Sequence, residues 1–245
     1  MMNWSSKELS DILKENVKDS DSLELILSCV NSIPQRLARI DFCVYKLKNL
    51  YFLAFPGLEP DEISDLLFES NIGASTEEQK RVILNLQLEA NIFVDSLIQS
   101  LHMCTELFAN LINLALELNV KRKPYIKCIQ NQLIEPRHEE LRFQITQLID
   151  SKEYKYIDAY TNENKHNHLI KIKSTSNPID HIEIKPFSRL SQNKGKEEYA
   201  AIYLSDLLNN ITPLIKSQII NIGIALNEAA VNKKLMRDGF QPPHN

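Results

Sequence analysis

The chain has 245 residues, of which 43% are hydrophobic and 24% are charged, and its net charge is −4. These values are ordinary for a globular protein, and a chain of this length can bury a core without disulfides or metals to hold it together. Only 5 residues are glycine. Because tight turns and hairpins need the positive φ angles that glycine adopts most readily, the sequence predicts long helices joined by few turns.

The four cysteines lie far apart in the sequence. Because none lies within three residues of another, the sequence excludes a C-x-x-C redox motif and a zinc knuckle. Three of them fall in apolar helical runs, which predicts buried free thiols in a reducing compartment. Residues 1–8 lack the apolar region of a signal peptide, so we expect a cytoplasmic protein. The cysteines are Cys29, Cys43, Cys104 and Cys128.

Helix signals follow one another closely in the first part of the chain. Ser6 is a candidate N-cap for the first helix, and Pro34 suits the first turn of the third. Pro56 and Gly57 end that helix, and Pro60 opens the next one. The helices predicted here cover residues 7–17, 22–31, 34–51 and 60–70.

The longest helix is predicted for residues 76–118. It opens with Thr76 and Gln79 in a capping-box pattern and meets no proline or glycine before Pro124. At about 1.5 Å per residue it is roughly 65 Å long, enough to extend into a dimer. Apolar residues recur every three or four positions, interrupted once by Ser100, which predicts the interior helix of a bundle. The apolar positions are Ile83, Leu86, Ala90, Phe93, Leu97, Cys104, Leu107, Leu111, Leu114 and Leu118.

The opposite side of this helix carries a regular polar stripe. Because a charged or amide side chain recurs every turn, the stripe excludes a membrane span and predicts a helix that touches water along one narrow edge. Within the stripe, His102 lies one turn before Glu106, and this pair is a candidate ligand-binding site. The alternative is a partly exposed structural histidine. The stripe consists of Asp95, Gln99, His102, Glu106, Asn110, Asn113 and Glu117.

After this helix the pattern stays helical to about residue 161 and then changes. Residues 168–173 and 181–185 alternate in polarity, with turn-forming residues 174–178 between them, which predicts a β-hairpin. A lone hairpin is marginally stable, so it must pack on the bundle or pair with another strand. Thr212 and Pro213 read as an N-cap and first-turn proline. The remaining predictions are helices at 124–133, 136–149, 153–161, 197–209 and 213–237, a polar loop at 188–196, and a flexible tail at 239–245.

Together these elements predict a mainly α protein, a multi-helix bundle around a long central helix (about 76–118) with one β-hairpin insertion (about 168–186). We expect a single helical domain over residues 1–245, in which residues 168–196 form the hairpin and loop insertion.

The sequence contains no glycine-rich phosphate loop, dinucleotide fingerprint or G-x-S-x-G elbow, so we predict no cofactor. One Glu-x-x-His pair, Glu135 and His138, has the spacing found in di-iron bundles. It occurs once, and Pro136 places it at a helix start. We therefore predict no metal site.

Charge is distributed unevenly along the chain. Residues 152–196 contain 9 Lys and Arg against 5 Asp and Glu, a local net charge of +4, although the whole chain is acidic. One interpretation is a set of solvated lysine-rich loops. The other is a surface that faces an anionic partner such as RNA.

Within this segment, residues 161–166 combine side chains that can hold and cleave a phosphodiester. His166 has an ordinary pKa near 6.5 and can exchange protons at neutral pH, and Lys165 beside it can hold an anion. Asn162 lies four residues before His166. The alternative is a helix C-terminus, where asparagines cap the chain and cations complement the helix dipole.

This segment resembles the active-site signature of the HEPN superfamily, helical-bundle proteins of which many are metal-independent RNases in toxin–antitoxin and phage-defence systems. The signature is an arginine, often followed by asparagine, with histidine after four to six intervening residues. Asn162 matches the asparagine and His166 the catalytic histidine, whereas Thr161 stands where the family has arginine. The resemblance implies RNA cleavage by His166 with help from Asn162 and Lys165, although a lysine lacks the forked geometry of arginine.

Three functions remain open on the sequence. The first is a non-catalytic interaction or scaffold protein of bacterial type, with a protein partner or a second copy of itself, since no complete catalytic set is present. The second is a HEPN-like RNase that uses His166. The third is a small-molecule sensor with a pocket beside His102 and Glu106.

Overall fold

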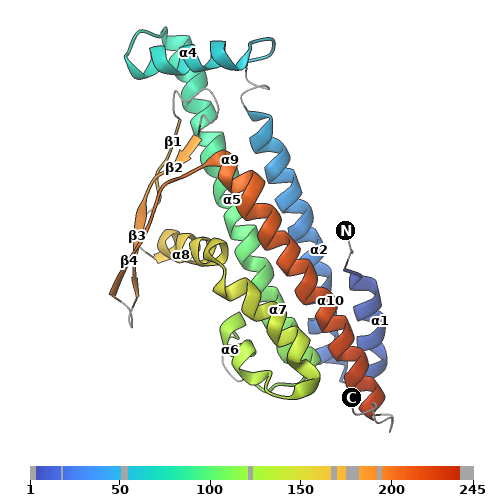
Figure 1. The fold of residues 1–245 in the computed structure, drawn as a ribbon. Coiled ribbons are helices and arrows are strands. Elements are labelled where there is room, and N and C mark those ends of the chain that lie inside the picture. The colour runs from blue at the N-terminus through green and yellow to red at the C-terminus, as the bar shows by residue number, and fades with distance from the viewer. Residues whose placement is uncertain are drawn as a thin grey trace. The chain divides into compact units, whose positions relative to one another are not determined.

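The computed structural model describes residues 4–17, 19–50, 55–120, 124–166, 170–174, 182–191 and 195–237. It is mainly α, with a long helix and a small β insertion, as predicted (Figure 1). The chain divides into two compact units. Unit 1 comprises residues 1–38, 101–155 and 214–245, and unit 2 comprises residues 39–100 and 156–213. The predicted tail at 239–245 lies outside the described residues, and the single-domain organisation stays a prediction.

The helices and strands keep the labels of Figure 1. The helices are α1 (Ser6–Asn16), α2 (Ser20–Lys48), α4 (Pro60–Asn71), α5 (Glu77–Ala115), α6 (Ile126–Gln132), α7 (Glu139–Asp150), α8 (Lys152–His166), α9 (Leu204–Asp206) and α10 (Thr212–Arg237). The strands are β1 (Ile172–Ser174), β2 (Ile182–Ile184), β3 (Phe187–Ser191), β4 (Gly195–Tyr199) and β5 (Ile202–Tyr203). A short 3-10 turn covers Pro136–His138, and a π-helical turn covers Leu207–Ile211.

The long helix α5 begins where the capping box predicts. The Gln79 backbone N–H donates to Thr76 Oγ1 at 3.2 Å, and the Thr76 N–H donates to Gln79 Oε1 at 2.8 Å. The helix ends three residues earlier than predicted because Glu117 adopts a left-handed conformation with φ 54°. The Leu118 N–H then donates to Asn113 O at 3.0 Å, which satisfies a terminal carbonyl as a Schellman motif does.

Helix α2 corrects the prediction of two separate helices at 22–31 and 34–51. It runs from Ser20 to Lys48 with Pro34 inside it. An interior proline removes one backbone hydrogen bond and costs about 3 kcal/mol. Val30 and Ile33 before it, and Ile40 after it, are all fully buried. Burial of this continuous apolar face offsets the lost bond, so the helix does not break.

Unit 1 packs α1 along the C-terminal part of α10, as Figure 1 shows. Trp4, at the start of the chain, donates from Nε1 to Asn227 Oδ1 at 3.0 Å, and its ring lies 5.3 Å from that of Phe108. The Asn227 amide donates to the Ser5 carbonyl and to Glu8 Oε2, both at 3.1 Å. One asparagine of α10 therefore holds the tryptophan and the first turn of α1 in place.

Unit 2 contains the whole β insertion. β1 and β2 pair antiparallel, with Ile172 opposite Ile184, as the predicted hairpin requires, and β5 adds a third strand beside β2. The predicted turn at 174–178 lies almost entirely outside the described residues. Gln87 of α5 donates to the Ile172 carbonyl at 3.2 Å, so the sheet packs on α5.

The region after β2 differs from the prediction. The described residues of the predicted loop at 188–196, together with the start of the predicted helix 197–209, belong to the antiparallel pair β3–β4, in which Phe187 lies opposite Tyr199. Helix resumes at Leu204 and continues through the π-helical turn into α10, so Thr212 does not start a separate helix. The residues of β4 are mostly polar, and their strand conformation depends on pairing with β3 and on aromatic contacts to α8.

Candidate functional site

The C-terminal turn of α8 carries the residues that resemble the HEPN signature. Lys165 and His166 follow Asn162 by three and four residues, which places the three positions on one side of the helix. Lys165 is exposed and Asn162 is half-buried. α8 ends at His166, whose side chain lies outside the described part of the structure. The backbone thus brings the three predicted residues to one helix face.

The Asn162 side chain is bound to its own helix. Its Nδ2 donates to the Asp158 carbonyl at 2.7 Å and to Asp158 Oδ1 at 3.0 Å. The other carboxylate oxygen of Asp158 accepts a hydrogen bond from Arg189 Nη1 at 2.6 Å, which is also an ion pair. Asp158 therefore links the Asn162 amide to β3 and places a negative charge beside it.

Arg189 is a residue that sequence reasoning missed. It lies 31 residues from Asp158, in a segment predicted as a loop, and it reaches α8 only because β3 packs there. Its guanidinium brings a cation to the helix face that carries Asn162. The spacing along the chain contains no signal for this contact, because it depends on the pairing of two strands.

Thr161, which stands at the position of the family's arginine, faces the interior. It is 1% exposed, and its hydroxyl has no hydrogen-bond partner within the described part of the chain. A charged side chain at this position would have to be buried, which is unfavourable without a paired opposite charge. A cationic side chain at position 161 would therefore not reach a phosphate bound at the surface of α8.

A polar network around Asp95 fastens the end of α8 to α5. Asp95 Oδ1 accepts hydrogen bonds from the Tyr160 hydroxyl and, at 2.9 Å, from Asn164 Nδ2. Asn164 Oδ1 in turn accepts from the Ile170 backbone N–H at 2.8 Å. Burial raises the pKa of Asp95, and the hydrogen bonds from Tyr160 and Asn164 act in the opposite direction. Burial, together with the Asp95 charge, also raises the pKa of Tyr160.

Four aromatic rings attach the β3–β4 pair to α8. The rings of Phe187 and Tyr199 stack with centroids 5.0 Å apart, and Tyr156 meets Phe187 edge-on at 5.3 Å. Tyr160 lies edge-on to Phe187 at 5.9 Å. Because the rings pack against one another, they form a small core for the insertion and do not offer a free stacking platform for bases.

His102 and Glu106, the second candidate site, lie in unit 1 on α5. His102 is 6% exposed, and its Nδ1 lies 4.0 Å from Glu106 Oε1, the limit for an ion pair. Next to them, the Thr105 hydroxyl donates to the His102 carbonyl at 2.7 Å and lies 3.2 Å from the Tyr154 hydroxyl. The polar stripe is therefore covered here by α8, so it does not meet water along its length as predicted.

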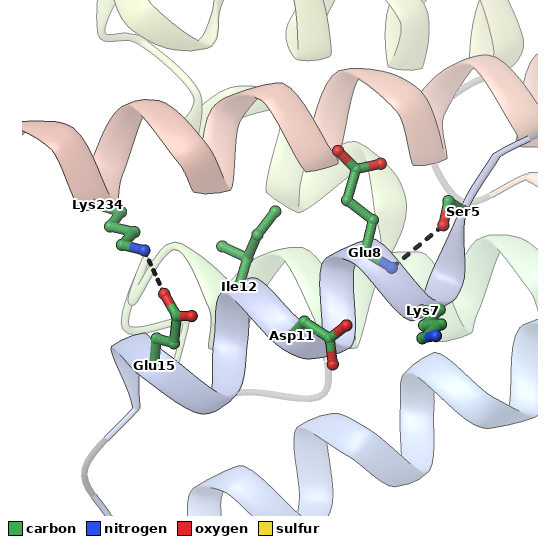
Figure 2. A pocket seen from close by; sticks show the side chains of 7 residues that line it. All are labelled: Ser5, Lys7, Glu8, Asp11, Ile12, Glu15 and Lys234. Atoms are coloured by element: carbon green, nitrogen blue, oxygen red, sulfur yellow. Dashed lines mark hydrogen bonds and ion pairs between the residues drawn. The ribbon is translucent and has the colours of Figure 1, made fainter.

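Another group of charged residues lies in a shallow groove of about 450 Å³ between α1 and α10 (Figure 2). Glu15 forms an ion pair with Lys234, and Ser5 Oγ accepts from the Glu8 backbone N–H at 3.2 Å. Glu8 also accepts from Asn227 of α10. These contacts hold α1 against α10. They explain why the charged side chains gather here, so no bound ligand is needed to explain them. The groove is lined by Ser5, Lys7, Glu8, Asp11, Ile12, Glu15 and Lys234.

The Glu-x-x-His pair lies at the 3-10 turn before α7, with Glu135 at its N-cap and His138 at its end. Glu135 forms an ion pair with Arg137 at 2.6 Å, and His138 is buried, 3% exposed, with no hydrogen bond to Nδ1 within the described residues. Burial lowers the pKa of His138 and the charges of Arg137 and Lys233 lower it further, whereas the charge of Glu135 acts in the opposite direction. No group of three potential metal ligands occurs among the described residues.

We expect His138 to make stability depend on pH. The pKa of His138 in the folded protein lies below the ordinary value of about 6.5. At pH values between these two pKa values, the unfolded chain therefore binds more protons than the folded chain. Its contribution is therefore fully present above about pH 6.5 and is lost as the pH falls towards the folded pKa. Urea unfolding between about pH 7 and pH 5 should show a larger loss of stability for the native chain than for His138→Gln. Parallel curves for the two proteins would contradict this assignment.

Within unit 2, α5 exposes three large apolar side chains, Leu84, Leu88 and Ile92, which we name the unit 2 apolar face. On α2, Phe42 and Tyr45 are exposed as well, and the Phe42 ring contacts that of Phe93 on α5 with centroids 6.1 Å apart. The prediction that the long helix is buried on most sides is wrong for this stretch. The exposed fractions are 54% for Phe42, 59% for Tyr45, 57% for Leu84, 52% for Leu88 and 61% for Ile92.

Comparison of the chain with family models, with curated proteins and with solved structures finds no match. Within the described residues, no helix is long and apolar enough to cross a membrane.

Proposed function

We propose that this protein is a non-catalytic interaction protein that binds another protein chain through the unit 2 apolar face. The observation that carries the proposal is the exposure of three large apolar side chains at four-residue intervals along α5, each more than half accessible. At about 100 Å² per side chain, they form a surface of roughly 300 Å². Apolar patches of this size on soluble proteins commonly mark interaction sites.

The chemistry at the end of α8 supports the same proposal. The Asn162 amide donates hydrogen bonds to the backbone carbonyl and the carboxylate of Asp158, and the Thr161 side chain is buried in the core. Asp158 also forms an ion pair with Arg189, so this guanidinium is not offered to a phosphate at this face. Of the predicted set of Lys165, Asn162 and His166, the amide is therefore already engaged within α8, and the position of the family's arginine supplies no cation.

The basic segment gives limited support to RNA as the partner. Four of its eight described Lys and Arg residues lie within ion-pair distance of a carboxylate, which neutralises part of the local positive charge. These residues are Lys152, Lys185, Arg189 and Lys196. RNA binding by residues 152–196 stays a prediction.

A HEPN-like RNase that uses His166, with Asn162 and Lys165 assisting, is the second candidate. The observation that favours it is Arg189, because its guanidinium reaches the Asn162 face of α8 from β3. In such an enzyme Arg189 would contact the scissile phosphate, which Thr161 cannot do. To do so, the guanidinium would have to leave the Asp158 carboxylate and bind the phosphate instead.

An RNA cleavage assay separates the two candidates. We expect the purified full chain to leave total RNA intact without added metal, and the His166→Ala variant to behave identically. The same buffer with added pancreatic ribonuclease serves as the positive control. Cleavage by the native chain that disappears in both His166→Ala and Arg189→Ala would overturn the proposed function in favour of the RNase.

A further inference from the structure

We infer that the exposed face of the sheet β1–β2–β5 binds single-stranded nucleic acid, with phosphates on its lysines and a base stacked on its tyrosine. The inference goes beyond the proposed function, because it concerns a second surface of unit 2 and a different class of partner. It also narrows the basic segment 152–196 to one surface, which we name the lysine face. The lysine face consists of Lys171, Lys173, Glu183, Lys185 and Tyr203.

The two faces of this sheet differ in burial. The isoleucines of β1 and β2 are at most 4% exposed, and Gln87 of α5 donates to the Ile172 carbonyl, so this face packs on the body of unit 2. Successive side chains of a strand point to opposite faces. Lys171 and Lys173, on either side of Ile172, therefore project to the other face, where both are exposed.

Pairing with β2 and β5 adds three more side chains to the exposed face. Glu183 lies opposite Lys173 on one side and opposite Tyr203 on the other. The Lys185 N–H donates to the Lys171 carbonyl at 2.9 Å, which continues the pairing by one residue and sets these two lysines opposite each other. Tyr203 is 45% exposed. Five residues from three neighbouring strands thus form one surface.

The charge of the lysine face suits an anionic partner. Three lysines against one glutamate give a net charge of +2, in a chain whose net charge is −4. The glutamate is already engaged by Lys185 at 2.6 Å. Like charges directly opposite each other destabilise a sheet, so the pair of Lys171 and Lys185 opposes folding. Bound anions remove this repulsion, and a phosphodiester chain supplies them at regular intervals.

Tyr203 indicates which anionic partner fits. Proteins bind single strands by combining cations for the phosphates with an accessible aromatic ring for a base. At about 4.8 Å between strands, Tyr203 lies about 10 Å from Lys173 across β2, which leaves room for a sugar between a bound phosphate and a stacked base. A duplex keeps its bases stacked on one another. An anionic membrane would find a single ring to bury, and membrane affinity scales with buried apolar area.

The first test is fluorescence anisotropy of the full chain with labelled single strands of about ten nucleotides, one of uridine and one of thymidine, at about 0.15 M salt. We expect a dissociation constant of roughly 1–100 µM, the ordinary range for sequence-independent binding. With three lysine contacts, the slope of log Kobs against log salt should be about −2. A duplex of the same length should bind more weakly. The thymidine strand has no 2′-hydroxyl group to attack its backbone, so it reports binding whether or not RNA is cleaved.

The second test exchanges the exposed lysines. Lys171→Glu combined with Lys173→Glu should weaken binding at least about 10-fold and bring the salt slope above about −1. Lys7→Glu combined with Lys127→Glu is the matched control, because these lysines are also exposed but belong to unit 1. It changes the net charge by the same amount and should leave the dissociation constant within about twofold, since salt screens distant charges. Circular dichroism checks that both variants fold.

The third test includes a variant that should gain affinity, which misfolding cannot produce. Glu183→Gln removes the carboxylate of the lysine face and releases Lys185, so it should tighten binding and make the salt slope steeper by about 0.7. Tyr203→Ala should weaken binding about 5- to 100-fold, whereas Tyr203→Phe, which keeps the ring, should bind like the native chain.

No measurable binding of either single strand at about 100 µM protein would overturn the inference, and so would equal weakening by the two double-lysine variants. Duplex binding as tight as that of the single strands would contradict the stacking on Tyr203. Binding to phosphatidylserine vesicles without binding to either strand would assign the lysine face to a membrane instead. Binding of the uridine strand alone would restrict the partner to RNA, and binding of both would extend it to single-stranded DNA.

Discussion

Replacing Tyr160 by alanine is expected to lower the free energy of unfolding by about 3–5 kcal/mol, the usual range for a large aromatic side chain in a core. Tyr160 is fully buried, and its ring contacts those of Tyr156 and Phe187. Its removal leaves a cavity at the point where β3 packs on α8. Urea unfolding followed by circular dichroism measures the change.

The Tyr160→Phe variant separates the ring from the hydroxyl group. It keeps the packing but removes the hydrogen bond to the half-buried Asp95 carboxylate, so we expect a loss of about 1–3 kcal/mol. The bond from Tyr160 lowers the pKa of Asp95, so the pKa of this carboxyl should rise further in the variant. If phenylalanine were as damaging as alanine, the ring packing described here would contribute nothing.

The second large effect is expected at Gly223 of α10, where a side chain would collide with Trp4. A Cβ built at this position lies 2.6 Å from both Cγ and Cδ2 of the indole, closer than real Cβ contacts. The indole cannot move freely, because Phe108 packs against it and Asn227 accepts its N–H. We expect Gly223→Ala to lower stability through overpacking, which typically costs about 1–3 kcal/mol.

A double-mutant cycle of Gly223→Ala and Trp4→Ala tests this prediction most directly. Alanine stabilises a helix by about 1 kcal/mol relative to glycine, an effect that opposes the overpacking. In a Trp4→Ala background the collision is absent, so Gly223→Ala should become stabilising. Because Trp4 is the only tryptophan of the chain, its fluorescence reports directly on displacement of the ring in the single variant. A stabilising effect in both backgrounds would show that the indole yields without cost.

The beginning of α5 shows how far local signals reach. The capping box and the absence of proline and glycine act within a few residues of one another, so they predict the helix from the sequence alone. The end of the helix was less predictable, because Glu117 adopts a conformation that glycine usually provides. At Pro34 a local signal predicted a helix start that burial of Val30, Ile33 and Ile40 overrides.

The β3–β4 pair shows the opposite case. Its sequence is polar enough to be predicted as a loop and a helix start, and its strand conformation depends on the rings of Tyr156 and Tyr160 on α8. Arg189 reaches Asp158 only through this pairing. A contact between residues 31 positions apart leaves no periodicity in the sequence, so the position of the Arg189 guanidinium at α8 could not be foreseen.

The sequence by itself determined the helical class, the long helix with its polar stripe and the grouping of Asn162, Lys165 and His166, because these follow from spacing within one or two helical turns. Only the tertiary structure decided what each side of those helices meets. Asp95 is joined to Tyr160 and Asn164, whereas Leu84, Leu88 and Ile92 are left open to solvent. Periodicity marks which side of a helix is apolar or polar, but burial depends on which distant segment packs there.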